Sequence, residues 1–513
     1  IAINRVLRTG GTAALVYGTG NMGVAPSMLH SQRVAVAAAS TASGAGDLDL
    51  TLALVDGSGK GEADPCFEAH KQPLCKWAQA VWYEWIPRAA LNAIFRSAKC
   101  RLTGAASVWR RVFGPGAAFL ASAWRLGWTP TSATEFNDEL GVAHDLTIVT
   151  PAFVNSLVHR AVVSWRWKRV EAKHPHLRQG DGGYGPFVQP IYKLLRPKDL
   201  EDWGPRERGA LRSAYANRQW PQARRCQAKR VVSPACRLCV GTGRCDDGDT
   251  SPQFAGTLLH RVLSCPATQL FRDEFAPDWV KALARRYVQQ GYRLDTASSD
   301  FVTRALAPSP AAMIDAPPSE ASFRWIVPPP DDGLPVGSTV YADGSRLFAE
   351  HKYFGMAARQ GWSVVALDAN GRFVASASGV PPPWAEGIYG AELWALWQAI
   401  RISGAGDQYR IDCLSIRLGA CRGFDWAVSG DRKLGRLWCL VAEALLGRCN
   451  DLAWMPAHCG NGQAGRRMLS NGQVLTSVDI AANDYVDGKA KVEARATQPP
   501  RGRGYHAFGP CAA

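Results

Sequence analysis

Three acidic residues stand at positions where solvation alone does not explain them. Asp343 and Asp412 each end a short apolar run, and Glu392 begins an amphipathic stretch. Glu392 shares its helical face with Ala395 and Ala399, whose small side chains let a carboxylate approach a sheet closely. Clustered carboxylates repel one another, so such a group requires divalent cations, and hard oxygen ligands suit Mg²⁺ or Mn²⁺. The alternative is a set of separate surface acids at element ends.

Two further residues extend this candidate group. His458 follows an apolar run and the dipeptide Pro456-Ala457, and a histidine on a loop beside carboxylates can transfer protons. Asp487 lies on the last predicted helix, where Asp484, one turn earlier, is the competing acid.

The elements that would position these residues follow from periodicity and turn signals. Asn370-Gly371 is a strong hairpin dipeptide between two apolar runs. The order of elements predicts an α/β fold, a mixed five-stranded sheet with helices against it, after a mainly helical N-terminal region. The predicted strands cover 338–343, 362–368, 372–378, 409–412 and 452–455, and the predicted helices begin near 390, after 412 and near 478.

A cluster of cysteine and histidine residues lies between 231 and 270. A Cys-x2-Cys pair is followed, twenty residues later, by a His-x4-Cys pair, and these two pairs could complete one tetrahedral zinc shell. Cys245 is a competing ligand and Cys226 lies just upstream. The alternative is a set of unrelated buried thiols. The predicted ligands are Cys236, Cys239, His260 and Cys265.

The motifs around the acidic residues of 336–495, and their order along the chain, resemble those of the ribonuclease H family, type 1. The cysteine cluster, with Thr257 three residues before the histidine, resembles the zinc knuckle that follows the polymerase in non-LTR retrotransposon proteins. The whole layout resembles the C-terminal end of a non-LTR retrotransposon-like reverse transcriptase polyprotein. The matching ribonuclease H segments are Tyr341-Ala342-Asp343-Gly344-Ser345, Ala391-Glu392-Leu393-x-Ala395-Leu396, Ile411-Asp412, Trp454-Met455-Pro456-Ala457-His458 and Asn483-x3-Asp487.

The resemblance implies an endonuclease that hydrolyses the RNA strand of RNA–DNA hybrids by two-metal catalysis with Mg²⁺ or Mn²⁺. It implies that Asp343 bridges both ions, that Glu392 and Asp412 hold one and Asp487 the other, and that His458 shuttles protons. The implied partners are an RNA–DNA hybrid and element RNA. No Asp-Asp pair lies on a hydrophobic hairpin, so polymerase activity is not expected. The alternatives are a catalytically inactive nucleic-acid-binding protein derived from a decayed retroelement, and an integrase-like nuclease of the same fold.

Composition narrows the class of protein. The 513 residues are 47% hydrophobic and 20% charged, which excludes wholesale disorder, and the net charge of +15 favours a polyanionic partner. Fourteen scattered cysteines indicate a reducing intracellular compartment, the nucleus or the cytoplasm. No apolar stretch approaches the roughly 20 residues of a membrane span, so no membrane partner is expected, and the sequence does not identify protein partners. The chain begins with Ile, so we expect the native N-terminus to lie upstream.

Most of the positive charge lies in one segment. Residues 159–230 contain 17 Lys and Arg against 6 Asp and Glu, interleaved with aromatic residues. Cations that neutralise phosphates beside rings that stack on bases are typical of a nucleic-acid-binding surface. The alternative is a solvated basic face with ordinary core aromatics. These aromatic residues include Trp165, Trp167, Tyr184, Tyr192, Trp203, Tyr215 and Trp220.

A glycine motif near the start, Gly18-x-Gly20-x2-Gly23, matches the dinucleotide-binding fingerprint. Pro26 should interrupt the helix that this fingerprint needs, and the next acid is Asp47, so no nucleotide site is expected.

These observations divide the chain into six regions. Eight prolines in the thirty residues 306–335 indicate a linker, and the Arg-Gly repeats near the end indicate a disordered tail. The regions are 1–150, helical and post-polymerase; 151–230, basic and nucleic-acid-binding; 231–270, zinc knuckle; 271–335, helical then Pro-rich linker; 336–495, ribonuclease H-like; and 496–513, disordered tail.

Overall fold

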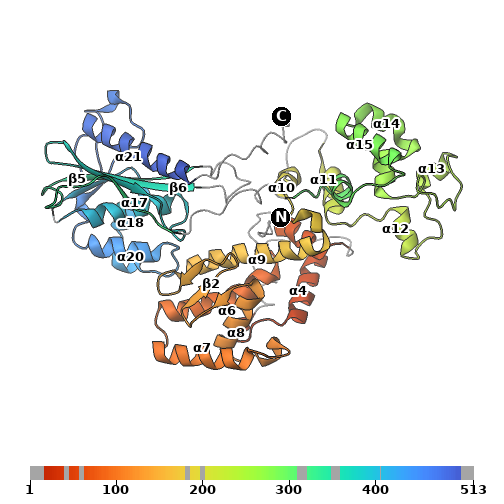
Figure 1. Ribbon diagram of the computed structural model, residues 1–513, viewed down its shortest axis with the longest axis horizontal. Coiled ribbons are helices and arrows are strands. Elements are labelled where there is room, and N and C mark those ends of the chain that lie inside the picture. Colours follow the sequence, from red (N-terminus) through yellow and green to blue (C-terminus); the bar gives the residue numbers. More distant parts are fainter. Residues whose placement is uncertain are drawn as a thin grey trace. The chain divides into compact units, whose positions relative to one another are not determined.

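The computed structural model describes residues 17–39, 46–56, 63–178, 185–196, 203–308, 320–347, 359–404 and 406–497 (Figure 1). The chain forms two compact units, the first built mainly from Val24–His70 and His159–Ala312 and the second mainly from Lys71–Val158 and Met313–Ala513. The predicted region 1–150 is therefore divided between both units. Among the described residues, no helix combines the length and the apolar character needed to cross a membrane.

The first unit is helical. Its apolar core includes Leu50, Trp167, Tyr215 and Leu306, all buried. A buried guanidinium, that of Arg33, links several of its segments by ion pairs (see below). Its helices are α4 (Pro26–Ala39), α5 (Leu48–Asp56), most of α9 (Pro151–Lys173), α10 (Gln189–Leu195), α11 (Pro205–Tyr215), α12 (Gln222–Gln227), α13 (Arg237–Gly241), α14 (Gln269–Phe275), α15 (Asp278–Gln289) and α16 (Thr296–Arg304), with a π-helical turn at His260–Ser264.

The glycine motif near the N-terminus contains only a four-residue helix, α3 (Thr19–Met22). The prediction that Pro26 interrupts a helix is wrong. Pro26 is the first residue of α4, where its fixed φ and missing N–H are tolerated. No helix opens at Gly23, so the requirement of the dinucleotide fingerprint is not met in this described segment.

The N-terminal part of the second unit combines helices with a small sheet. The long helix α6 (Pro65–Trp82) leads into α7 (Arg88–Leu102), the short 3-10 turn η2 (Val108–Arg111) and α8 (Pro115–Leu126). Three short strands then form an antiparallel sheet, β1 (Thr129–Pro130), β2 (Glu135–Asn137) and β3 (Ala143–Asp145). The prediction of a helical region here missed this sheet, because two- and three-residue strands are too short to show a period of two.

The C-terminal part of the second unit is built on a mixed sheet of six strands, not five. In space the order is β4-β7-β6-β5-β8-β9, antiparallel from β4 to β5, with β8 parallel to β5 and β9 parallel to β8. The additional strand β4 comes from the Pro-rich stretch that was predicted to be only a linker. The strands are β4 (Arg324–Val327), β5 (Thr339–Leu347), β6 (Arg359–Leu367), β7 (Phe373–Gly379), β8 (Gln408–Ile411) and β9 (Leu452–Trp454).

Helices cover both faces of this sheet (Figure 1). One face packs against α17 and α20 through a core that includes Val340, Leu396 and Trp438, and the other packs against α21 through Tyr341 and Val486. Successive residues of β5 thus point to opposite faces, as the pleat of a strand requires. The helices are α17 (Gly387–Ile402), α18 (Leu414–Ala420), α19 (Phe424–Ala427), α20 (Gly435–Ala444) and α21 (Ser477–Ala496). Beyond Thr497, the predicted disordered tail lies outside the described residues.

The two parts of the second unit meet at the loop between α19 and α20. The indole N–H of Trp82 donates to the carbonyl of Val428 (3.3 Å), and the N–H of Gly430 donates to the hydroxyl of Tyr83 (3.0 Å). The N–H of Ala152 donates to the carbonyl of Gly430 (3.1 Å). These bonds join residues about 280 to 350 positions apart. The two parts of this unit were therefore predicted to be separate regions of the chain.

Candidate functional site

The three predicted carboxylates of the sheet domain come together. Asp343 lies within β5, Glu392 on the first half of α17 and Asp412 directly after β8. One carboxylate oxygen of each lies within 4.8 Å of the others. Because β5 and β8 are parallel neighbours, the position of Asp412 at the end of β8 places it beside β5. The alternative of separate surface acids is excluded for these three residues.

A close contact between strand and helix fixes this geometry. The N–H of Gly344 donates to the Oε2 atom of Glu392 (3.1 Å). A Cβ atom at position 344 would overlap the backbone of Ala391 and Glu392. Only glycine therefore lets α17 approach β5 closely enough to bring the two carboxylates together.

The carboxylates are buried, and their charges repel one another. Asp343 is 4% exposed and Glu392 8% exposed. Burial, together with the charges of Asp412 and Asp487, raises the pKa of Asp343 to about 8. Burial and the neighbouring acids also raise the pKa of Glu392 well above its usual value. Such a group is costly without counter-ions, so its donor set of oxygens in a buried, negatively charged site fits a divalent cation.

Asp412 is the most accessible of the three carboxylates, and it has one neutral and one charged neighbour that favour its ionised form. Burial raises its pKa, whereas a hydrogen bond from the Asn483 side chain and the charge of His458 lower it. The indole N–H of Trp454 donates to the Asp412 carbonyl (2.8 Å), which ties the ends of β8 and β9 together. Asn483 was part of the predicted motif, but its contact with Asp412 was not predicted.

His458 and Asp487 stand at the edge of this group. His458 is exposed and has a positive φ of 50°, a conformation that is uncommon for residues other than glycine. Asp487 is outside the set of three, but its charge acts on both Asp343 and Asp412, and it pairs with Lys491 on the next turn of α21. Asp484 is exposed, and no described interaction joins it to the carboxylates. The electrostatics thus favour Asp487 over Asp484.

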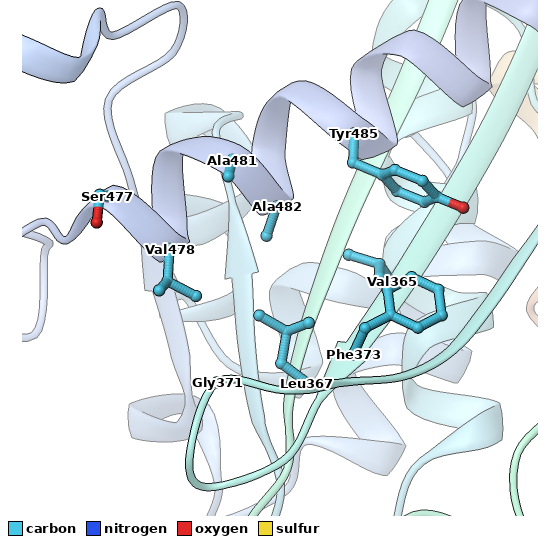
Figure 2. Close-up of a pocket in the computed structure, with 9 residues that line it drawn as sticks. All are labelled: Val365, Leu367, Gly371, Phe373, Ser477, Val478, Ala481, Ala482 and Tyr485. Atoms are coloured by element: carbon cyan, nitrogen blue, oxygen red, sulfur yellow. The ribbon is translucent and has the colours of Figure 1, made fainter.

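A hollow elsewhere on the domain is not the candidate active site. A groove of about 450 Å³ lies between the β6–β7 hairpin and the first half of α21, lined by residues such as Leu367, Phe373 and Tyr485 (Figure 2). Its lining contains no charged side chain, so it has no carboxylate to hold a metal ion and no cation to neutralise phosphate.

The four predicted zinc ligands also come together. The Sγ atoms of Cys236 and Cys239 lie 3.9 and 3.5 Å from that of Cys265, and Cys239 Sγ lies 3.3 Å from Nε2 of His260. A tetrahedral zinc ion with ordinary bond lengths separates its sulfur ligands by about 3.8 Å and sulfur from nitrogen by about 3.5 Å. All four side chains are buried, and their ligand atoms lie within 4.8 Å of one another. The spacing thus fits one zinc ion.

The chemistry of these groups supports the same conclusion. Burial lowers the pKa of His260, so its imidazole is neutral, and a hydrogen bond to the backbone of Gln253 helps orient the ring. Burial and the neighbouring thiols raise the pKa of Cys239 and so disfavour its thiolate form. A bound cation would stabilise that thiolate. Cys245 only packs against the cluster, and Cys226 donates to the carbonyl of Val232 instead, so neither belongs to the ligand set.

A third group of potential ligands, His174, His176 and Asp300, has a structural explanation. His174 Nδ1 lies 2.7 Å from the Asp300 carboxylate, and its Nε2 lies 3.0 Å from the Arg304 guanidinium. The guanidinium can only donate, so Nε2 accepts and Nδ1–H donates to Asp300. Both ring nitrogens are therefore used, and the adjacent positive charge of Arg304 disfavours a cation.

The basic segment 159–230 is partly neutralised by acids that are distant in sequence. Lys173 lies 3.3 Å from the carboxylate of Asp49. Asp49 and Asp64 also bind the buried guanidinium of Arg33, at 2.7 and 2.9 Å respectively. Three cation–acid pairs are Arg166–Asp56 (3.6 Å), Arg169–Asp49 (3.2 Å) and Lys173–Asp47 (3.0 Å).

The aromatic residues of the same segment are largely occupied by the fold. Trp165 has the guanidinium groups of Arg33 and Arg169 over its ring at 4.9 and 5.0 Å. Tyr184 lies outside the described residues. Three of the remaining rings are buried: Trp167, Tyr192 and Tyr215. These three are core residues and are not available for base stacking.

The chain is thus a mixed α/β protein of several parts, with a carboxylate-rich site in the sheet domain and a thiolate-rich site in the first unit. Comparisons of the chain with protein-family models, with curated proteins and with solved structures give no match.

Proposed function

We propose that this protein is a divalent-cation-dependent nuclease of the ribonuclease H type that hydrolyses the RNA strand of RNA–DNA hybrids. The observation that carries the proposal is the convergence of Asp343, Glu392 and Asp412, from three separate elements, within 4.8 Å. The resemblance to ribonuclease H implies a mixed five-stranded sheet with helices against it. The strand order β7-β6-β5-β8-β9, with three antiparallel and two parallel strands, agrees with that expectation, and β4 is an addition at the edge.

In this proposal the carboxylates hold the metal ions. Asp343, Glu392 and Asp412 are the ligands, and Asp487 is close enough for its charge to act on two of them. Bound Mg²⁺ would supply an activated water and neutralise the leaving 3′ oxygen. The exposed His458, whose charge acts on Asp412, would accept and release a proton at the rim of the site.

The thiolate-rich centre supports a second part of the proposal. A structural zinc ion held by Cys236, Cys239, His260 and Cys265 would stabilise a knuckle whose partner is nucleic acid, as the resemblance to retrotransposon proteins implies. Thiolate ligands require reduced cysteines, which agrees with an intracellular, reducing location. The order of knuckle and nuclease agrees with a place in a retroelement polyprotein.

The test is cleavage by the full chain. We expect Mg²⁺-dependent cleavage of an RNA–DNA hybrid and little cleavage of duplex RNA or duplex DNA. Asp343→Asn should reduce the rate by at least about 100-fold, because it removes a charge from the metal site. Asp484→Asn removes a carboxylate from the exposed face of α21 and should leave the rate within a few-fold. If the wild-type protein bound hybrids but cleaved none of the three substrates, the decayed, nucleic-acid-binding alternative would replace this proposal.

A further inference from the structure

The longest acid-free stretch of the second unit lies outside the sheet domain and outside the basic segment 159–230. From Trp85 to Thr134 the chain contains no Asp or Glu, but seven Lys and Arg. Six of these cations fall within α7, the loop after it and η2. They are Arg88, Arg96, Lys99, Arg101, Arg110 and Arg111, and all six are exposed.

Helix α7 presents these charges because its other side is anchored. Leu91, Phe95, Ala98 and Leu102, which recur at helical spacing, are buried. Arg88, Arg96 and Lys99 lie on one flank of the same helix, while Arg101 lies on the other. At about 1.5 Å per residue, the cations from Arg88 to Lys99 span roughly 16 Å.

Two hydrogen bonds connect the end of α7 with η2 and the residues after it. The Arg101 side chain donates to the carbonyl of Phe113 (3.1 Å), and the Arg111 side chain donates to the carbonyl of Arg101 (3.5 Å). These bonds bring Arg110 and Arg111 next to the last turn of α7. We call the surface formed by the six cations the α7–η2 face.

The charges of the α7–η2 face are not neutralised within the part of the chain that the structure describes. None of the six cations forms an ion pair with a described carboxylate, in contrast to Arg169 and Lys173 of the basic segment, which pair with Asp49 and Asp47. Uncompensated cations on a rigid helix raise the local potential, because no neighbouring acid screens them.

We propose that the α7–η2 face binds the phosphate backbone of a nucleic-acid duplex. A duplex carries one charge per roughly 1.7 Å, so a length of roughly 16 Å of duplex carries about ten phosphate charges, and those on the side of the protein can pair with the cations of the α7–η2 face. Five of the six cations are Arg, whose planar guanidinium matches phosphate oxygens in pairs. A membrane-binding helix would keep an apolar stripe free for insertion, but the apolar stripe of α7 is buried.

The position of this face in the fold connects it with the carboxylate site. Trp82, the last residue of α6, and Tyr83, which follows it, form hydrogen bonds with the α19–α20 loop of the sheet domain. The duplex is therefore held by the same compact unit that carries Asp343 and Glu392. The inference concerns binding and does not depend on the proposed cleavage, so the two can fail separately.

The experiment compares full-length proteins in buffer without Mg²⁺. Fluorescence anisotropy measures their affinity for a labelled hybrid of about 20 base pairs at KCl concentrations between about 50 and 200 mM. The test variant is Arg88→Gln/Arg96→Gln/Lys99→Gln, which keeps helix-forming side chains. Each phosphate contact contributes about 0.9 to the slope of log affinity against log salt for a duplex. We therefore expect the slope to fall in magnitude by about two to three units, and affinity at the lowest salt to fall by at least tenfold.

The matched control is Arg286→Gln/Arg324→Gln/Lys433→Gln, which removes the same net charge. Each of these side chains is exposed and already paired with a carboxylate, Asp295, Glu493 and Glu386 respectively. We expect the control to change the slope by less than about one unit. Equal slopes for the two variants, with unchanged thermal unfolding, would overturn the proposal. So would a test variant that loses binding to phosphatidylserine vesicles but retains its affinity for the hybrid.

Discussion

Replacing Asp343 with Asn should stabilise the metal-free protein at alkaline pH while removing its cleavage activity. Asp343 is buried on β5 beside Glu392 and Asp412, and burial with like charges raises its pKa to about 8. In the unfolded chain the same carboxyl titrates near 3.9. The asparagine side chain has nearly the same shape but carries no charge, so it avoids the free-energy cost of burying an ionised carboxylate beside other acids.

The size and sign of the effect follow from proton linkage. Between pH 4 and 8 the folded state holds a proton on Asp343 that the unfolded state has lost, so wild-type stability is fully present at low pH and falls as pH rises through about 8. Four pKa units at 1.36 kcal/mol give an upper limit of about 5–6 kcal/mol. Water penetration and relaxation of the site reduce this value, and we expect at least about 2 kcal/mol to remain.

The assay is urea unfolding of both proteins from pH 4.5 to 8.5 in the absence of divalent cations. We expect similar stability near the acidic end and a growing advantage for Asp343→Asn toward the alkaline end. Saturating Mg²⁺ should then restore the wild type, since a ligand at about 100 times its dissociation constant adds about 2.7 kcal/mol to the state that binds it. Asp484→Asn, at an exposed position on α21, controls for the loss of one negative charge. A pH-independent difference between wild type and Asp343→Asn would refute the reasoning.

Three further predictions concern other parts of the two centres. Gly344→Ala should lower the free energy of unfolding by about 3 kcal/mol or more, because its Cβ would overlap the backbone of Glu392; an unchanged urea midpoint would contradict this. We expect elemental analysis to find about one zinc ion per chain in the wild type; Cys239→Ser should lose this ion, whereas Cys226→Ser should retain it. His458→Ala should lower the cleavage rate by about 10- to 100-fold, because water or buffer can partly replace a proton shuttle. A larger loss, equal to that of removing a metal ligand, would argue against this role.

The sheet of the second unit was predictable where hydrophobic runs and turn signals coincide. The strands around Asp343 and the hairpin at Asn370-Gly371 are observed within a few residues of their predicted ends. The predicted strand ended at Asp343, but β5 continues to Leu347 because nine consecutive residues pair with β6. Strand β4 was missed because it is only four residues long and lies in Pro-rich surroundings, and its pairing with β7 is set by tertiary contacts.

The candidate sites were predictable because their chemistry restricts residue type and spacing. The Cys-x2-Cys and His-x4-Cys pairs lie together as predicted. The twenty residues between them do not prevent this, because a loop of any such length can bring its two ends together. The hydrogen bond between Asn483 and Asp412 could not be predicted, because it depends on how α21 crosses the sheet. The role of Gly344 could have been suspected from its place beside Asp343, but its necessity depends on the approach of α17.

Charge counted along the chain is a poor measure of charge in space, and the two basic regions show why. Residues 159–230 have an excess of eleven cations, yet Arg166, Arg169 and Lys173 are paired with Asp56, Asp49 and Asp47, which lie more than a hundred positions earlier. The six cations of the α7–η2 face are fewer, but no described acid opposes them. A phosphate backbone responds to the local field, which falls where an acid lies within a few ångströms of each cation. The smaller cluster can therefore contribute more per cation than the larger one, and the salt slope of the Arg88→Gln/Arg96→Gln/Lys99→Gln variant measures the share that the α7–η2 face supplies.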